Sequence, residues 1–297
     1  MNSFKKRNRF YQILLNMLFA VICFITIFPL LLVVSISLSA ESDVIEYGYR
    51  LIPMKLVLSA YQYVFLNSAA VLNAYKVTAI FSVFGTFLSV FVMAGLAFAL
   101  SKRNLPGKNV MSFYIFFTML FSGGLVPSYI LITNYLHLAD NMLVYILPAL
   151  VSPWYVFMMR TFFTSLPYEM TESAQIDGAN EYMIFFEIVL PLSKSVLATV
   201  ALLTFLGKWN DWFTSMMYIN DEHLYSLQFL LQKIMNNIKM IQEQSAKGMG
   251  SFVSTSEIPS ETARMAMAIV VAGPALVVFP FFQKYFVKGM TVGAVKG

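Results

Sequence analysis

The chain has 297 residues, of which 59% are hydrophobic and only 12% are charged. A soluble domain carries roughly 25% charged residues, so this composition excludes a water-soluble protein and predicts an all-α integral membrane protein surrounded by lipid. The net charge of +5 fits a membrane protein facing an anionic inner leaflet and does not indicate a nucleic-acid partner. The single cysteine, Cys23, excludes an intrachain disulfide.

Apolar runs long enough to cross a bilayer recur six times. A hydrocarbon core about 30 Å thick needs ~20 apolar residues at a rise of about 1.5 Å each. The first run is longer than the roughly 7–15 apolar residues of a cleavable signal peptide, so we expect it to stay as an anchor. In the third run, Gly123, Gly124 and Pro127 predict close packing and a kink. The six predicted transmembrane helices are 12–38, 75–100, 110–132, 142–165, 195–218 and 265–286.

Lys and Arg in the short flanking segments predict the orientation, because such segments resist translocation. They gather before the first span, in the 101–109 loop and in the tail, which places the N- and C-termini in the cytoplasm. The protein is therefore expected in the cell membrane, cytoplasmic or inner, as a multi-pass chain. Its predicted parts are a basic N-terminus (1–11), five spans with a cytoplasmic hairpin at 166–193 (12–218), an outer loop (219–264), the sixth span (265–286) and a cytoplasmic tail (287–297).

The predicted spans offer little to power transport. Ion-coupled carriers use ionisable side chains deep in the bilayer. Here only Lys208 and Asp211 lie well inside a span, ~21 and ~25 Å along the fifth helix from Lys194. The sequence also has no GxxxxGK[ST] loop to bind nucleotide phosphates. Energy for transport must therefore come from a partner.

Five acidic residues are concentrated between Glu169 and Glu187, in the predicted cytoplasmic hairpin. The stretch SLPYEMTESAQIDGA (165–179) predicts a short helix with Ser165 as its cap and Pro167 near its first position. Acidic residues in the opening turns favour a helix start. This pattern predicts a first helix with an acidic surface.

Gly178 then predicts a sharp turn, and a second helix over 180–190 is expected to end at Pro191. Ser173 and Ala174 keep one side of the first helix slim, so a protein partner can approach closely while the acidic residues pair with its cations. The alternative is an amphipathic hairpin lying on the inner leaflet. Acidic charge against an anionic leaflet disfavours it.

This segment resembles the EAA loop of ATP-binding-cassette (ABC) importer permeases. Glu172, a small residue and Ala174 are followed after three residues by Gly178, and after nine more by an Ile-x-Leu-Pro sequence that ends at Pro191. The DGA sequence at 177–179 is similar to the sugar-importer branch. Departures from the family pattern are Ser173, where alanine is usual, and Ser195, where many relatives have proline.

The tail GMTVGAVKG (289–297) resembles the C-terminus of the maltose-type second permease subunit. The resemblance covers nearly the whole chain and is greatest to importers of oligosaccharides such as rhamnogalacturonan or alginate fragments. It implies a type I ABC importer permease fold, in which this chain forms half of the translocation pore. The implied chain is a transport subunit and not an enzyme.

The resemblance also implies partners: a homologous second permease subunit, two ATPase subunits, an extracellular or periplasmic solute-binding protein, an oligosaccharide substrate and membrane lipid. ATP and Mg would bind to the ATPase, so no cofactor is expected in this chain. A coupling helix at 168–178 would enter a cleft of the ATPase. The implied coupling residues are Glu169, Glu172, Ser173, Ala174, Asp177, Gly178, Ala179 and Pro191. Tail contacts to the ATPase are implied for Gly293, Ala294, Val295, Lys296 and Gly297, with a frayed end as the alternative.

Aromatic and polar residues of the fourth and fifth spans are candidates for the substrate path, because sugars need flat apolar faces and hydrogen-bonding groups. Lys208 and Asp211 lie one helical turn apart and are expected to pair. For the tryptophans, an aromatic belt or helix packing is the alternative. The candidates are Trp154, Lys208, Trp209, Asn210, Asp211 and Trp212.

The outer loop combines an apolar run at 224–238, which predicts a helix, with a Gly- and Ser-rich stretch at 245–261. In maltose-type relatives the corresponding loop probes the binding protein, and a disordered connector is the alternative here. The implied contacts to the binding protein are Lys247, Gly248, Met249, Gly250, Ser251 and Phe252.

Two classes of function remain open from the sequence. The first is a sugar-import permease driven by a separate ATPase, with a non-sugar solute as a variant within that class. The second is a stand-alone channel or secondary carrier in which the acidic hairpin is regulatory.

Overall fold

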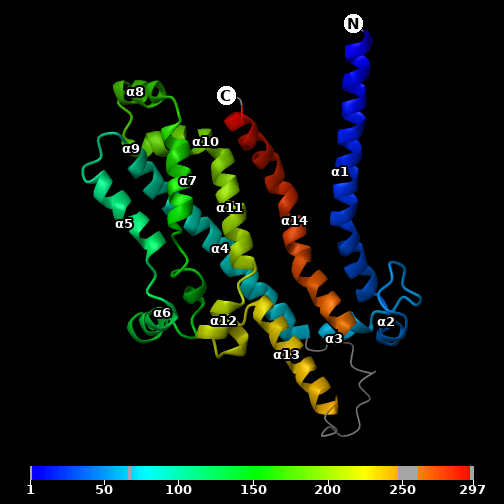
Figure 1. Ribbon diagram of the computed structural model, residues 1–297. Helices are drawn as coiled ribbons and strands as arrows, with labels where there is room; N and C mark the ends of the chain where they lie inside the picture. Colours follow the sequence, from blue (N-terminus) through cyan, green and yellow to red (C-terminus); the bar gives the residue numbers. More distant parts are fainter. Residues whose placement is uncertain (1, 66–67, 247–259, 295–297) are drawn as a thin grey trace. The chain divides into compact units, whose positions relative to one another are not determined.

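The computed structural model describes residues 2–65, 68–246 and 260–294. Every regular element in these ranges is helical, which confirms the all-α prediction for the described part of the chain (Figure 1). The chain divides into two compact units. Unit 1 comprises residues 1–68 and 233–273, and unit 2 comprises residues 69–232 and 274–297. Helices α13 (Leu227–Ala246) and α14 (Glu261–Ala294) contribute to both units.

Helix α1 (Asn2–Ser37) is the apolar anchor of unit 1. Its segment Tyr11–Ser37 is long and apolar enough to cross a membrane, and no residue of its most apolar window is buried. Exposing apolar area to water costs roughly 25 cal/mol per Å². The surface of α1 is therefore stable only against lipid or an apolar protein surface. The other complete helices of unit 1 are α2 (Glu41–Tyr47) and α3 (Ser59–Val64).

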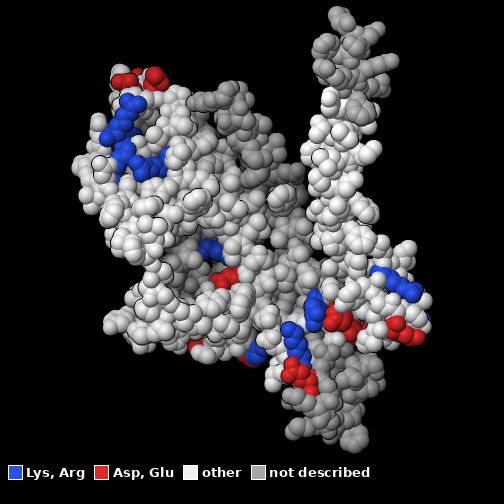
Figure 2. Space-filling model, in the orientation of Figure 1, with Lys and Arg blue, Asp and Glu red and all other residues white. Residues whose placement is uncertain are grey.

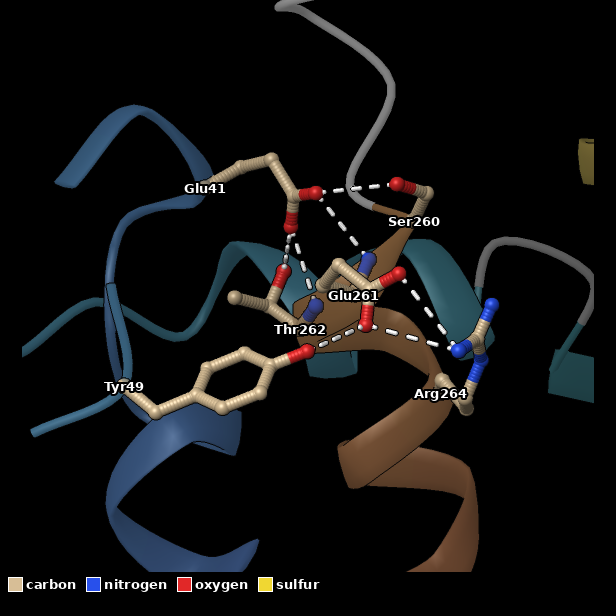
Figure 3. A network of polar contacts seen from close by, with 6 residues as sticks. All are labelled: Glu41, Tyr49, Ser260, Glu261, Thr262 and Arg264. Atoms are coloured by element: carbon tan, nitrogen blue, oxygen red, sulfur yellow. Dashed lines mark hydrogen bonds and ion pairs between the residues drawn. The ribbon is translucent and has the colours of Figure 1, made fainter. Parts of the chain in front are cut away.

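The Glu41 carboxylate of α2 holds the start of α14 (Figure 3). One oxygen accepts from the Ser260 hydroxyl (3.0 Å) and the Glu261 amide (3.0 Å), and the other accepts from the amide (2.9 Å) and hydroxyl (2.7 Å) of Thr262. Amides in the first turn of a helix have no partner within the helix, so Glu41 supplies one. Burial, the largest single influence, raises the pKa of the Glu41 carboxyl, but the hydrogen bonds together outweigh it and the pKa lies below its ordinary value.

We expect Glu41→Gln to lower the thermal unfolding midpoint of the purified protein in lipid nanodiscs, because an amide has one acceptor oxygen and presents an NH₂ group to donors. Breaking hydrogen bonds of a buried charged group costs about 1–3 kcal/mol. The depressed pKa means that this stabilisation is present above the unfolded-state pKa and is lost as the pH falls through the folded-state pKa. The difference between the two proteins should therefore shrink in acid.

Glu243→Gln, at an exposed position of α13, is the matched control and should leave the midpoint unchanged. Equal midpoints for Glu41→Gln and the unaltered protein at neutral pH would show that Glu41 does not stabilise the start of α14.

Unit 2 is built around one long helix, α4 (Ser68–Ser101), and a series of shorter ones. The α-helices are α5 (Lys108–Leu120), α6 (Leu125–Ile130), α7 (Pro153–Thr164), α8 (Tyr168–Ile176), α9 (Glu181–Met183), α10 (Leu190–Leu192), α11 (Lys194–Trp209) and α12 (Phe213–Tyr218). Two π-helical segments, η1 (Leu131–Tyr135) and η3 (Ile184–Val189), and two 3₁₀ turns, η2 (Met142–Tyr145) and η4 (Glu222–Leu224), complete the unit.

Three of the six predicted spans coincide with long apolar helices. In the described residues these are Tyr11–Ser37, Ala69–Ser101 and Glu261–Pro280. Up to five spans result if each of two bent helix pairs counts as one. The prediction of six spans therefore remains a prediction.

The other three predicted spans are interrupted, so the expectation of continuous helices was wrong there. The predicted span 110–132 turns by 113° between α5 and the α6–η1 segment, after Gly124 with a φ of 83°. Positive φ strains residues that have a Cβ, which explains why glycine stands at this turn. The expected kink is thus a turn through more than a right angle.

In the predicted span 142–165, only Pro153–Thr164 is α-helical. Pro148 and Pro153 lack an amide hydrogen and restrict the residue before them, which disfavours a continuous helix through this stretch. The 12 residues of α7 cover roughly 18 Å, less than a bilayer core. The predicted span 195–218 breaks between α11, which ends at Trp209, and α12.

A core cluster in unit 2 lies beneath the acidic hairpin. It joins α4, α7, η3 and α11, and Ala174 and Ala179 of the hairpin pack against it. Its buried members are Met93, Ala94, Ala97, Leu100, Val156, Met159, Phe163, Ile184, Phe185, Val189, Val196 and Val200.

Candidate functional site

The acidic hairpin begins with α8 (Tyr168–Ile176), close to the predicted coupling helix 168–178. Pro167 occupies the N-cap position, and no side chain caps the helix there. The expectation that Ser165 caps α8 was wrong, because its hydroxyl donates to the Phe162 carbonyl (2.7 Å) at the end of α7. Ser165 therefore terminates the helix before the hairpin.

The turn after α8 is a Schellman motif. Gly178 has a φ of 85°, its amide donates to the Gln175 carbonyl (3.1 Å), and the Ala179 amide donates to the Ala174 carbonyl (2.8 Å). This pair of bonds satisfies the last carbonyls of α8 and requires a left-handed residue at the turn. The Asn180 side chain then accepts from the Met183 amide (2.9 Å) and starts the next helix. The predicted helix, tight turn and helix are all present.

The surface of α8 is open. None of its residues is buried, and Ile176 is 81% exposed. Glu169, Glu172 and Asp177 are exposed as well. Figure 2 shows acidic side chains gathered over α8, next to a group of basic side chains. An exposed apolar residue among acids suits a protein partner better than an anionic lipid surface.

After the turn, the second helix continues farther than predicted. It runs through α9, η3 and α10 to Leu192, so Pro191 lies inside its last turn. The bend of 80° follows between Leu192 and Lys194, where α11 begins. Proline tolerates the first positions of a short helical segment, which accounts for its place in α10.

The end of α11 holds a buried lysine. Lys208 is 6% exposed, and its ammonium group donates to the Tyr145 carbonyl (3.2 Å). A Cβ at Gly85 of α4 would come within 3.1 Å of the Lys208 side chain, so a glycine there makes room for it. The expected ion pair with Asp211 is not among the ion pairs of the described residues. Asp211 lies beyond the end of α11 and instead accepts from the Thr214 amide (3.0 Å).

Hydrogen bonds that the sequence did not predict support this break in the helix. The Tyr145 hydroxyl is bonded to Ser215 Oγ, Ser215 Oγ donates to Ser226 Oγ (3.0 Å), and Ser226 Oγ donates to the Asp211 carbonyl (2.8 Å). Thr78 of α4 accepts from the Leu227 amide (2.8 Å). The only signal in the sequence was a set of hydroxyl residues in apolar surroundings, which does not reveal partners so distant along the chain.

The six candidates for the substrate path fall into different environments. Trp209 is buried and stacks on Phe205, with ring centroids 5.8 Å apart, which favours the packing alternative for this residue. Trp212 and Trp154 are exposed, the latter on α7. Asn210 is exposed, and its side chain is bonded to Leu206 and Gln228.

Two other groups of predicted contact residues lie wholly or partly outside the described residues. Residues 247–252, the predicted binding-protein contact, and 295–297 of the tail lie outside the described residues. Gly293 and Ala294 belong to α14, so the segment expected as a separate tail from 287 is helical as far as Ala294. The predicted outer helix 224–238 is present as α13, from Leu227 to Ala246.

Residues 91–292 match the family described as the binding-protein-dependent transport system inner membrane component. This range contains the hairpin, its supporting core and the break after α11. The chain belongs to this family. The resemblance to ABC importer permeases is therefore confirmed, and the protein is a transport permease of the membrane rather than an enzyme.

Similar permeases are known from Bacillus subtilis (strain 168). The chain is 36% identical to Protein LplC, over 92% of this chain and 90% of that protein. It is 34% identical to the polygalacturonan/rhamnogalacturonan transport system permease protein YtcP, over 98% of this chain and 100% of that protein. A solved structure of a bacterial ABC transporter involved in the import of the acidic polysaccharide alginate has a TM-score of 0.79 and 29% identity, and covers 94% of this chain and 97% of its own.

Permeases of this family act with a second permease, an ATPase and a solute-binding protein. The hairpin of this permease combines an exposed surface with a direct connection to the buried core.

Gly178→Ala is expected to strain the turn of the permease. No atom lies within 4 Å of a Cβ at this position, so the cost comes from its positive φ alone, about 1–2 kcal/mol. The thermal unfolding midpoint in detergent should fall accordingly. Gly95→Ala in α4 also meets no atom within 4 Å but has no positive φ, and it should not lower the midpoint. Equal effects of the two variants would contradict the role of the left-handed turn.

Proposed function

We propose that this permease is the second membrane subunit of an ATP-driven oligosaccharide importer, with six spans and both termini in the cytoplasm. It forms half of the pore, a homologous permease forms the other half, and two ATPase subunits attach below. The observation that carries the proposal is α8, which has no buried residue, bears exposed acidic side chains and ends in a Schellman turn next to the core that joins α4, α7 and α11.

Contacts between loops support the predicted topology. The 101–107 loop meets the hairpin through Lys102 and Glu181, whose Nζ and Oε2 atoms are 2.6 Å apart, so the two segments lie on one side. Asp140, between the third and fourth predicted spans, accepts from the Asp221 amide (3.0 Å) and from the Asn220 side chain (3.2 Å). Hydrogen bonds from these amides hold the pKa of the Asp140 carboxyl below its ordinary value. This second contact supports placing the segment between the third and fourth predicted spans on the same side as the predicted outer loop 219–264.

In this proposal α8 is the coupling helix. Exposed Glu172 meets a basic residue of the ATPase, exposed Ser173 allows close approach, and Gly178 fixes the angle of the hairpin turn. The ATPase binds ATP and Mg, and its closure moves α8. Because Ala174 and Ala179 pack on the core cluster, movement of α8 displaces the helices beneath it. The C-terminal residues 293–297 contact the ATPase, and 247–252 contact the binding protein.

The proposed substrates are oligosaccharides, including acidic ones. The names of one relative and of the similar solved structure refer to polygalacturonan, rhamnogalacturonan and alginate, which supports this class. Within the chain, exposed Asn210 and Trp212 at the break after α11 are the best placed of the candidates to meet a sugar, whereas Lys208 and Trp209 shape the wall behind them. Trp154 is a separate candidate on α7.

Affinity purification of the tagged chain tests the coupling role. The unaltered permease should bring down a second permease and an ATPase, and Glu172→Arg should reduce the recovered ATPase at least tenfold. Placing two cations together at an interface costs several kcal/mol, and ~1.4 kcal/mol is already a factor of ten. Quantitative immunoblotting of the eluate measures the loss.

Glu243→Arg, on the predicted outer side, is the control for the charge change and should recover the ATPase in full. Transport by the chain alone in liposomes would contradict the proposal and favour the stand-alone carrier.

Substrate class is tested by competition for uptake in cells that depend on this importer. Oligogalacturonides of a few units should reduce uptake of a labelled oligosaccharide substrate, while an amino-acid mixture should not. If only a non-sugar solute competes for uptake, the proposal of an ATP-driven permease stands and the proposal of a sugar substrate is rejected.

A further inference from the structure

We propose that Glu181 and Lys102 form a strut that transmits movement of the coupling hairpin to α4 and α5, in addition to the path through the core. The inference rests on the proposed function, because it takes α8 as the element that the ATPase moves. It assigns both residues a positioning role, because they act through contacts between the hairpin and the end of α4.

Glu181 lies just after the hairpin turn and links two segments with one carboxylate. Its Oε2 atom is 2.6 Å from Lys102 Nζ, at the end of α4. Its Oε1 atom accepts from Gln175 Nε2 (3.3 Å), in the last turn of α8. A displacement of α8 therefore acts on Lys102 through a single rigid group.

Lys102 is itself fixed to two helices. Its ammonium group lies 4.5 Å from the ring centroid of Phe98, one turn back in α4. Its carbonyl accepts from Lys108 Nζ (2.8 Å), in the first residue of α5. The strut thus ends at the junction of α4 and α5 and not on a freely moving loop.

A second contact holds the other end of α8. The Arg103 guanidinium lies 4.6 Å from the ring centroid of Tyr168, the first residue of that helix. A cation within about 6 Å of an aromatic ring is attracted to its face. The 102–103 segment therefore contacts α8 near both of its ends, through Tyr168 directly and through Gln175 by way of Glu181.

The polar contacts matter because a cavity separates the hairpin from the loop that precedes α5. A cavity of about 700 Å³ lies between the 101–106 loop and the hairpin, and Lys102, Arg103, Tyr168, Gln175 and Glu181 all line it. Where close packing is interrupted by a cavity, force passes through the groups that bridge it. Here the bridging groups are the ion pair and the cation–π contact.

The strut contributes little to folding, which makes it testable. The Lys102 and Glu181 side chains are 25% and 56% exposed, and ion pairs of this kind add little to stability. Variants are therefore expected to fold, to insert and to retain the ATPase, because α8 itself is unchanged. Their defect should be in coupling.

The experiment uses the complete importer in proteoliposomes and measures sugar transported per ATP hydrolysed. Lys102→Glu and Glu181→Lys should each lower this ratio by about twofold to thirtyfold, the range that coupling energies along such networks give. The double swap, Lys102→Glu with Glu181→Lys, should restore it, and Lys102→Arg should retain it. Lys194→Glu, an exposed basic residue at the start of α11, is the matched control with an unchanged ratio.

The strut is overturned if both single variants transport as much sugar per ATP hydrolysed as the unaltered permease. It is also overturned if the double swap transports no more sugar per ATP than the single variants. Loss of the ATPase from Lys102→Glu would also overturn it, by showing that Lys102 is a docking residue. If the unaltered permease recruits no ATPase at all, the proposed function fails, and this inference fails with it.

Discussion

A break within a membrane-spanning helix depends on hydrogen bonding without water. In a bilayer an unpaired backbone group costs several kcal/mol, so a span can be interrupted only where protein groups replace the missing helical bonds. The break after α11 meets this condition through Ser226, which bonds to the Asp211 carbonyl, and through Asp211, which accepts from the Thr214 amide. Buried Lys208 is tolerated because its ammonium group donates a hydrogen bond to the Tyr145 carbonyl.

The hairpin is stabilised in a different way, by hydrogen bonds within its own turn. Its carbonyls are satisfied locally by the Schellman turn, so it needs no tertiary partner to keep its shape. Small side chains at positions 174 and 179 let it lie close to the core, while its outer face stays free. A rigid element with one attached face and one open face is what force transmission between subunits requires.

Local signals in the sequence predicted the hairpin well. Gly178 and Asn180 act within a few residues, so their effects can be read without knowledge of the fold. The bends and interruptions within the spans could not be predicted in the same way, because hydropathy depends on composition and not on backbone direction. The sharp turn at Gly124 and the irregular stretch before Pro153 occur within runs that remain apolar throughout. The partners of Lys208 and Glu181 were also hidden, since Tyr145 and Lys102 lie far away along the sequence.

The bare surface of α1 has a consequence for how this helix finds its neighbours. In hydrocarbon, bringing two apolar helices together removes no water, so association relies on shape and on small residues that allow backbones to touch. Residues 2–37 contain no glycine, and bulky aliphatic and aromatic side chains fill the helix. Its lateral contacts must therefore be loose and broadly interchangeable, so that sequence drift among Leu, Ile, Val and Phe in α1 is tolerated far more readily than at the hairpin.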